Sequence, residues 1–249
     1  MGDWKEAWQL TKIELKTYLW WNLLGAIIFI VAAALLGIGF PYYMDNNPLL
    51  EENNPGLYDI GFIAMFWVVP YWIRPKEFRY QAVSSDFWVT PYFIKLMQLP
   101  IPDSVIIKHR FLSQMFVAVP YYVLFLILFY VFSGLTGTFM SPVTFVVFAV
   151  IWISFSIYAG HLYTASDAGD RISPFKMVLL FIVMGGVGLL VYLWFSFYSP
   201  YSAVEWTVLF ATEWPILSSV ISIVLAFLGL RYWMYHMKKT MNKLDYLYG

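Results

Sequence analysis

Cysteine is absent from this chain of 249 residues, so neither a disulfide framework nor a thiolate metal site is possible. Charged residues are scarce, at 12%, whereas soluble domains contain about 25%. Hydrophobic residues make up 61% of the chain, and the mean hydropathy is +0.68. These values predict a protein that lies in a lipid bilayer and does not fold around an aqueous core.

Signature motifs of nucleotide binding and hydrolysis are also missing. The sequence has no Gly-x4-Gly-Lys-Ser/Thr loop, no Gly-x-Gly-x-x-Gly turn, no His-Glu-x-x-His pair and no Gly-x-Ser-x-Gly elbow. His161, Asp167 and Asp170 could be grouped as metal ligands, but a polar helix end beside loop acids accounts for them better. We therefore expect no enzymatic activity, no cofactor and no metal site in this chain.

Basic residues are absent from alternate loops. Six long apolar runs divide the sequence into seven hydrophilic stretches, and all fifteen Lys and Arg residues fall in the first, third, fifth and seventh. Because cytoplasmic loops are enriched in Lys and Arg, this pattern places both termini in the cytoplasm. No basic face remains for a nucleic acid, so we expect no such partner.

The apolar runs predict one all-α, polytopic transmembrane domain over residues 1–249. Its six transmembrane helices are expected at residues 19–43, 57–73, 111–132, 142–163, 177–197 and 215–233. Residues 3–18 predict an amphipathic helix in the membrane interface. Its apolar side would carry Trp4, Trp8, Leu15 and Leu19, interrupted by Thr11, and its polar side Lys5, Glu6, Lys12, Glu14 and Lys16. The alternative is that this segment is only the start of the first span.

The centres of the predicted spans contain no ionisable residue other than tyrosine. Ion-coupled transporters and voltage sensors need charged groups at this depth, so the sequence argues against both classes. Four tyrosines could instead line a path for a lipid-like or amphipathic substrate: Tyr121, Tyr122, Tyr130 and Tyr158. Ordinary packing between helices is the alternative for each of them.

The loop at residues 74–110 holds six basic residues together with many aromatic ones. Ser85 and Asp86 are good N-terminal residues for a helix that would extend to Gln98, although Pro91 could break its start. The loop is therefore expected to form a compact helical element against the membrane. It ends in the run Leu96-Met-Gln-Leu-Pro-Ile-Pro-Asp-Ser-Val-Ile-Ile-Lys-His-Arg-Phe-Leu.

This layout resembles the permease subunits of ABC-2 type transporters, the exporter type of ATP-binding-cassette system. The resemblance is carried by the interfacial helix, the six spans, the long second inner loop and its Leu-Pro run. It implies a coupling helix in that loop, which docks on a separate ATPase through Ser85, Asp86, Phe87, Trp88, Tyr92 and Lys95. Asp170 and Arg171 would form a second inner contact, and the segment from Tyr201 to Trp214 would be a re-entrant element.

The resemblance also implies partners and a location. ATP and Mg would be bound by the ATPase, and a second permease copy or a paralogue would complete the transporter in a bacterial plasma membrane. Its substrate would be hydrophobic or amphipathic, and exporters of amphipathic toxin peptides such as phenol-soluble modulins fit the uncharged interior best. Two other functions stay open: a membrane-embedded enzyme acting on lipids, and a non-transporting scaffold or immunity protein.

Overall fold

The computed structural model describes residues 2–17, 19–44, 55–83, 87–134, 140–171 and 201–244, and scattered positions from 173 to 190. Helices dominate it, and the described residues contain four that are long and apolar enough to cross a membrane. These four are Trp20–Pro41, Asp103–Gly134, Pro142–Ser166 and Pro215–Met241. The prediction of a mostly helical chain, with helices long and apolar enough to span a membrane, is therefore confirmed.

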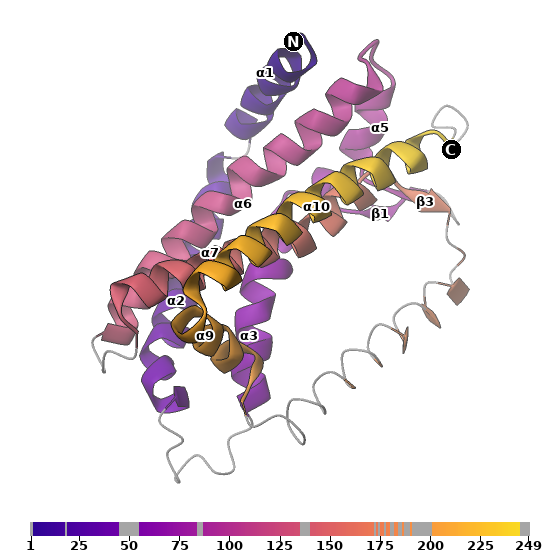
Figure 1. The fold of residues 1–249 in the computed structure, drawn as a ribbon. Coiled ribbons are helices and arrows are strands. Elements are labelled where there is room, and N and C mark those ends of the chain that lie inside the picture. Colours follow the sequence, from indigo (N-terminus) through magenta and orange to yellow (C-terminus); the bar gives the residue numbers. More distant parts are fainter. Residues whose placement is uncertain are drawn as a thin grey trace.

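The helices follow one another as a bundle of long rods with short elements at its two ends (Figure 1). In chain order they are α1 (Gly2–Thr17), α2 (Leu19–Met44), α3 (Pro55–Trp67), α4 (Val69–Trp72), the 3-10 helix η2 (Lys76–Phe78), α5 (Pro91–Met97), α6 (Asp103–Gly134), α7 (Pro142–Ser166), α9 (Ala203–Glu213) and α10 (Pro215–Met241). The described residues also form three short strands: β1 (Gln81–Ala82), β2 (Phe87–Val89) and β3 (Asp170–Arg171).

Two of the six expected spans are not confirmed. The span predicted at 177–197 lies for the most part outside the described residues. The span predicted at 57–73 is divided at Val68 into α3 and α4, and α3 alone has 13 residues, fewer than the roughly 20 that a crossing needs. Pro70 lacks the N–H that would reach the carbonyl of Phe66, and the Tyr122 hydroxyl donates to that carbonyl instead, at 3.0 Å.

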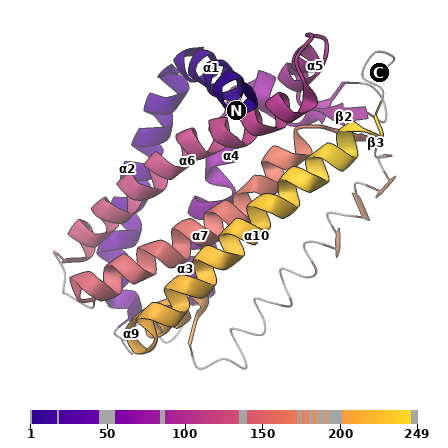
Figure 2. The same ribbon diagram turned by 45° about the horizontal axis from the view of Figure 1, so that its top comes forward.

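Elements rich in basic residues gather at one end of the bundle, which we call the basic end. Figures 1 and 2 show α1, α5, the strands, the start of α6 and the end of α10 there, whereas α9 lies at the opposite end. The ends of α2 and α6 and the starts of α7 and α10 point away from the basic end. The one-sided charge of the sequence is thus also one-sided in space.

The predicted helix from Ser85 to Gln98 is wrong in its first half. Phe87–Val89 is the central strand of a three-stranded antiparallel sheet, in which Ala82 pairs with Trp88 and Phe87 pairs with Arg171. The helix begins only at Pro91, because a proline disfavours helical backbone in the preceding residue, and Thr90 is extended with φ −79° and ψ 120°. Ser85 and Asp86 lie outside the described residues.

Two apolar cores hold the bundle together. The larger one joins α2, α3, α6, α7 and α9 and consists largely of aromatic rings, including Phe62, which lies 4.7 Å from Trp152 between ring centroids. The smaller one lies at the basic end, where the sheet and α5 pack on α6, α7 and the last turns of α10 through Phe87, Phe93 and Met237. The sheet and α5 are therefore packed onto the long helices.

At the end opposite the basic end, Asp59 anchors α9. Its carboxylate accepts hydrogen bonds from the backbone N–H groups of Ala203, at 2.8 Å, and Val204, at 3.1 Å. Ser202 and Glu205 complete a capping box at the same helix start. The segment expected as a re-entrant element is thus a helix tied to α3.

Candidate functional site

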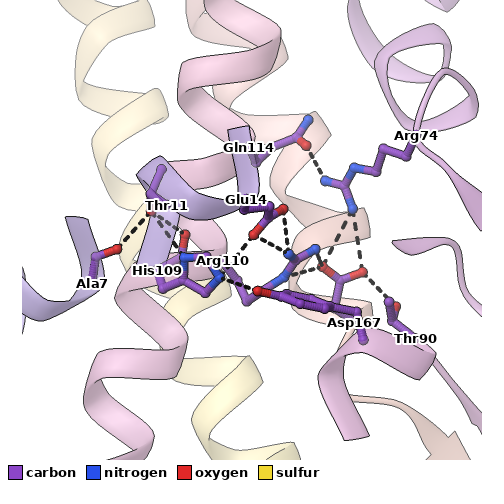
Figure 3. Close-up of polar contacts among 10 residues, drawn as sticks. Ala7, Thr11, Glu14, Arg74, Thr90, His109, Arg110, Gln114 and Asp167 are labelled. Atoms are coloured by element: carbon purple, nitrogen blue, oxygen red, sulfur yellow. Dashed lines mark hydrogen bonds and ion pairs between the residues drawn. The ribbon is translucent and has the colours of Figure 1, made fainter. Parts of the chain in front are cut away.

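Arg110 of α6 is the centre of a buried network of charged side chains (Figure 3). Its Nη1 donates to both carboxylate oxygens of Glu14, at 2.9 and 3.0 Å. Its Nε and Nη2 donate to Oδ2 of Asp167, at 3.1 and 2.7 Å. One guanidinium therefore joins α1 to the C-terminal end of α7, and charge-assisted bonds of this kind are the stronger ones in proteins.

Asp167 extends the network to the segment after α4 and to α5. The Thr90 hydroxyl donates to Asp167 Oδ1 at 2.8 Å, and the Thr90 N–H approaches the Asp167 carbonyl at 3.4 Å. Arg74 lies 3.5 Å from both carboxylate oxygens of Asp167 and donates to the side-chain carbonyl of Gln114. Since Thr90 precedes α5 directly, the start of that helix is fixed to the end of α7.

Glu14 is the acidic partner from α1. Burial by itself raises the pKa of this carboxyl, but the charge of Arg110 and the hydrogen bond from His109 outweigh it and lower the pKa to about 2. The Nε2 of His109 is 2.9 Å from Glu14, and its Nδ1 is 3.1 Å from the Thr11 hydroxyl. Two guanidinium groups and two carboxylates thus balance one another in the network, with His109 beside them.

Aromatic rings enclose the guanidinium of Arg110. It lies 5.6 Å from the ring centroid of Phe78 and 5.4 Å from that of Tyr92, and these two rings are 4.3 Å apart. The rings shield the guanidinium from bulk water and add cation–π attraction. In such surroundings the loss of one partner is expensive, about 3–5 kcal/mol, because the other charges stay buried.

A small polar cavity adjoins the network. Its walls include Arg74, Arg110, Ser113 and Gln114 on the polar side and Trp21 on the apolar side. Its volume is about 20 Å³, which is enough for about one water molecule. The cavity can therefore hydrate the network but is too small for a substrate in this conformation.

The residues expected to dock on an ATPase differ in exposure. Phe87 is buried, and Trp88 and Tyr92 are half-buried. Lys95 of α5 is exposed, and so are both residues of β3, Asp170 and Arg171. Since β2 pairs with β3, Phe87 and Trp88 of the first expected contact lie beside Arg171 and Asp170 of the second.

The four tyrosines expected along a substrate path are not grouped. Tyr121 and Tyr122 lie inside the larger core, where their hydroxyls donate to the carbonyls of Asn22 and Phe66 at 3.0 Å each. Tyr130 contacts Phe145 of α7, with ring centroids 4.4 Å apart. Tyr158 is 49% exposed and lies against α10, where its carbonyl accepts from Trp233.

The residues weighed as metal ligands have other partners. His161 is buried, stacks on Phe111 at 5.1 Å, and places Nδ1 2.6 Å from the carbonyl of Ile157. Asp167 pairs with arginines, and Asp170 is exposed. Within the described part of the chain, no three His, Asp or Glu side chains group as a metal site.

Helix α1 differs from the expectation in the burial of Glu14. Its buried face consists of Ala7, Thr11 and Glu14, whereas Trp4 is 52% exposed. Glu14 is thus an internal group and not part of a solvated face. The sequence carried one signal for this: Thr11, which interrupts the apolar rhythm, lies on the same helical face as Glu14. Nothing in the sequence pointed to Arg110 as its partner.

No protein-family model, curated protein or solved structure matches this chain.

Proposed function

We propose that this chain is the transmembrane subunit of an ATP-driven exporter, which works with a separate ATPase and moves a hydrophobic or amphipathic substrate. The observation that carries the proposal is the charge network. It connects an exposed surface at the basic end to α1 and to α6 and α7, two of the helices long and apolar enough to cross a membrane, so that a force on that surface would reach those helices.

The surface in question consists of Lys95 and the tip that follows α5, together with the exposed strand β3. Leu99, at the turn between α5 and α6, is 50% exposed and adds an apolar side chain to this surface. This tip protrudes beyond the other helices in Figure 2. An exposed apolar residue flanked by Lys95 and Gln98 is suited to a protein partner.

Transmission from this surface follows from three contacts. Movement of α5 displaces Thr90, and Thr90 is bonded to Asp167 at the end of α7. Asp167 holds Arg110 of α6, and Arg110 holds Glu14 of α1. Since each group is buried and paired, these elements move together or lose several kcal/mol. ATP binding by the partner would thereby favour one arrangement of the helices over another.

The apolar character of the helices supports the proposed substrate class. The larger core consists largely of aromatic rings, and the cavity beside the network, at about 20 Å³, is too small for a substrate. A path would therefore lie between two copies of the chain. Helix α10 has a long apolar exposed face, including Val220, Val224 and Leu228, which suits such a path or lipid contact. A charged ion would find no counter-charge there.

Photo-crosslinking tests the proposal. A photoreactive phenylalanine analogue replaces Lys95 in one variant and Lys239, an exposed residue at the end of α10, in a matched control. In membranes of the native cell, the variant at Lys95 is expected to capture a chain with a phosphate-binding loop, and the control is not. The co-purified pair should hydrolyse ATP, whereas the chain alone should not.

Two results would contradict it. The first is that no nucleotide-binding chain is captured at Lys95. The second is that such a chain is captured but Lys95→Glu and Asp170→Arg together leave its affinity unchanged, since both substitutions invert charges on the proposed surface.

A further inference from the structure

Helix α1 is electrically neutral in sequence but not on its exposed surface. It contains three lysines and three acids, which are Lys5, Lys12, Lys16, Asp3, Glu6 and Glu14. Burial of Glu14 against Arg110 removes one acid, and the Asp3 carboxylate is neutralised by the Nζ of Lys108 at 2.8 Å. Three exposed lysines then face a single remaining acid, Glu6.

The three lysines form a stripe along α1. At 3.6 residues per turn, Lys5, Lys12 and Lys16 fall within about 40° of one another around the helix axis, and Glu6 lies outside this arc. We call these three residues the lysine stripe. It therefore presents positive charge only, although the helix as a whole has mixed charge.

An aromatic stripe runs beside the lysine stripe. Trp8 packs on Phe116 of α6, with ring centroids 4.7 Å apart, and the Nζ of Lys12 lies 5.3 Å from the Trp8 ring. The Nζ of Lys108 lies 5.2 Å from the ring centroid of Trp4. Indole rings of this kind prefer the boundary between lipid and water. The lysine stripe is thus placed at the depth of lipid headgroups.

We propose that the lysine stripe binds anionic phospholipid headgroups and holds α1 against the membrane surface. Ammonium groups attract the phosphate of any lipid, but the net charge of an anionic headgroup makes the attraction selective, by about fivefold for each lysine near the surface. The proposal does not depend on transport or on an ATPase.

Continuity with the membrane-spanning helices favours lipid over a protein partner. Helix α1 leads into α2 within two residues, and Trp20 at that junction is 80% exposed. Phe116, the partner of Trp8 on α6, is also exposed, and α6 is long and apolar enough to cross the membrane. A protein that reached the lysine stripe would have to lie on the bilayer surface itself.

Energy transfer from one fluorophore tests the proposal, and the absence of cysteine makes a single attachment site possible. Gln9, exposed on α1, is replaced by Gln9→Cys and labelled. The full chain is placed in nanodiscs of phosphatidylcholine with phosphatidylglycerol, and the acceptor dye is carried by a small fraction of one lipid or of the other. Excess transfer to labelled phosphatidylglycerol measures local enrichment.

Wild-type α1 is expected to enrich phosphatidylglycerol about fivefold over phosphatidylcholine at low salt, and about 0.5 M salt should remove most of the excess. Replacement of Lys5, Lys12 and Lys16 by glutamine should abolish the enrichment, whereas arginine at the same positions should keep it. Equal transfer to both lipids in the wild type, or an unchanged excess in the glutamine variant, overturns the proposal. The lysine stripe would instead be assigned to a protein partner if transfer to the two lipids is equal and the glutamine variant captures less protein than the wild type when the photo-crosslinking at Lys95 is repeated in it.

Discussion

The network predicts a large loss of stability for Arg110→Met. Methionine fills much of the volume of arginine but leaves Glu14 and Asp167 without their main counter-charge. Each retains a weaker partner: Glu14 keeps His109 at 2.9 Å, and Asp167 keeps Arg74 at 3.5 Å and Thr90 at 2.8 Å. We therefore expect the lower end of the range for a broken buried pair, about 3 kcal/mol.

Thermal unfolding in detergent measures this loss. For a chain of this size, 1 kcal/mol corresponds to about 2–4 °C in Tm, so Arg110→Met should lower Tm by about 6–12 °C. Arg231→Met is the matched control, because that exposed side chain lies on α10 outside the network and over the ring of Phe227. Its effect should stay within about 0.5 kcal/mol.

A double-mutant cycle separates the charge from the packing. Glu14→Gln removes one uncompensated charge, so Arg110→Met combined with it should cost less than the sum of the two single changes, by about 1 kcal/mol or more. If Arg110→Met unfolds within about 1 °C of the wild type, or the two changes are additive, the network does not hold these helices together.

Two further predictions concern pH and backbone. The pKa of Glu14 is about 2 in the folded protein against an ordinary 4.5, so the folded state holds the charged form more strongly than the unfolded state does. Tm should therefore fall as pH drops from about 5 to about 2. Glu14→Gln should flatten that part of the profile of Tm against pH, and an unchanged slope would refute the role of Glu14. Gly169 has φ +89°, and a Cβ there would lie 2.7 Å from the carbonyl oxygen of Trp88, so Gly169→Ala should cost about 2 kcal/mol or more, measured by the same unfolding assay. Gly134→Ala, with open space around it, should cost much less, and equal effects would contradict this reasoning.

Membrane character and its one-sidedness could be predicted because both depend on composition along the chain. A run such as residues 142–163 is apolar on every face, and the observed α7 covers it with three further residues. The clustering of basic residues at one end follows from their spacing between such runs. These properties need no knowledge of which helices are neighbours.

Residues 87–89 were predicted as helix but form a strand, because the local sequence is compatible with both. Ser85 and Asp86 are good helix starts and Phe87 to Val89 are compatible with a helix or a strand, so pattern alone could not decide. Pairing with Asp170 and Arg171, more than eighty residues away in the chain, decided for a strand. Pro91 then fixed where the helix begins.

The candidate site was hidden for a related reason. In the sequence, Arg110 is one of many basic residues that indicate membrane orientation, and Glu14 fits the polar side of an amphipathic helix. An ion pair between residues 14 and 110 depends on α1 folding back along α6, and hydrophobic periodicity carries no information on such long-range contacts.

By itself, the sequence determined that the chain is mostly helical, that several helices are long and apolar enough to cross a membrane, and that the basic residues fall between alternate apolar runs, since each depends on the composition of local segments. Only the tertiary structure decided which charges face water and which are buried against one another. Burial of Glu14 on Arg110 creates the network and, by the same contact, leaves the lysine stripe of α1 without its balancing acid. Electrostatic balance between distant residues depends on their separation in space, and only the packed helices set that separation.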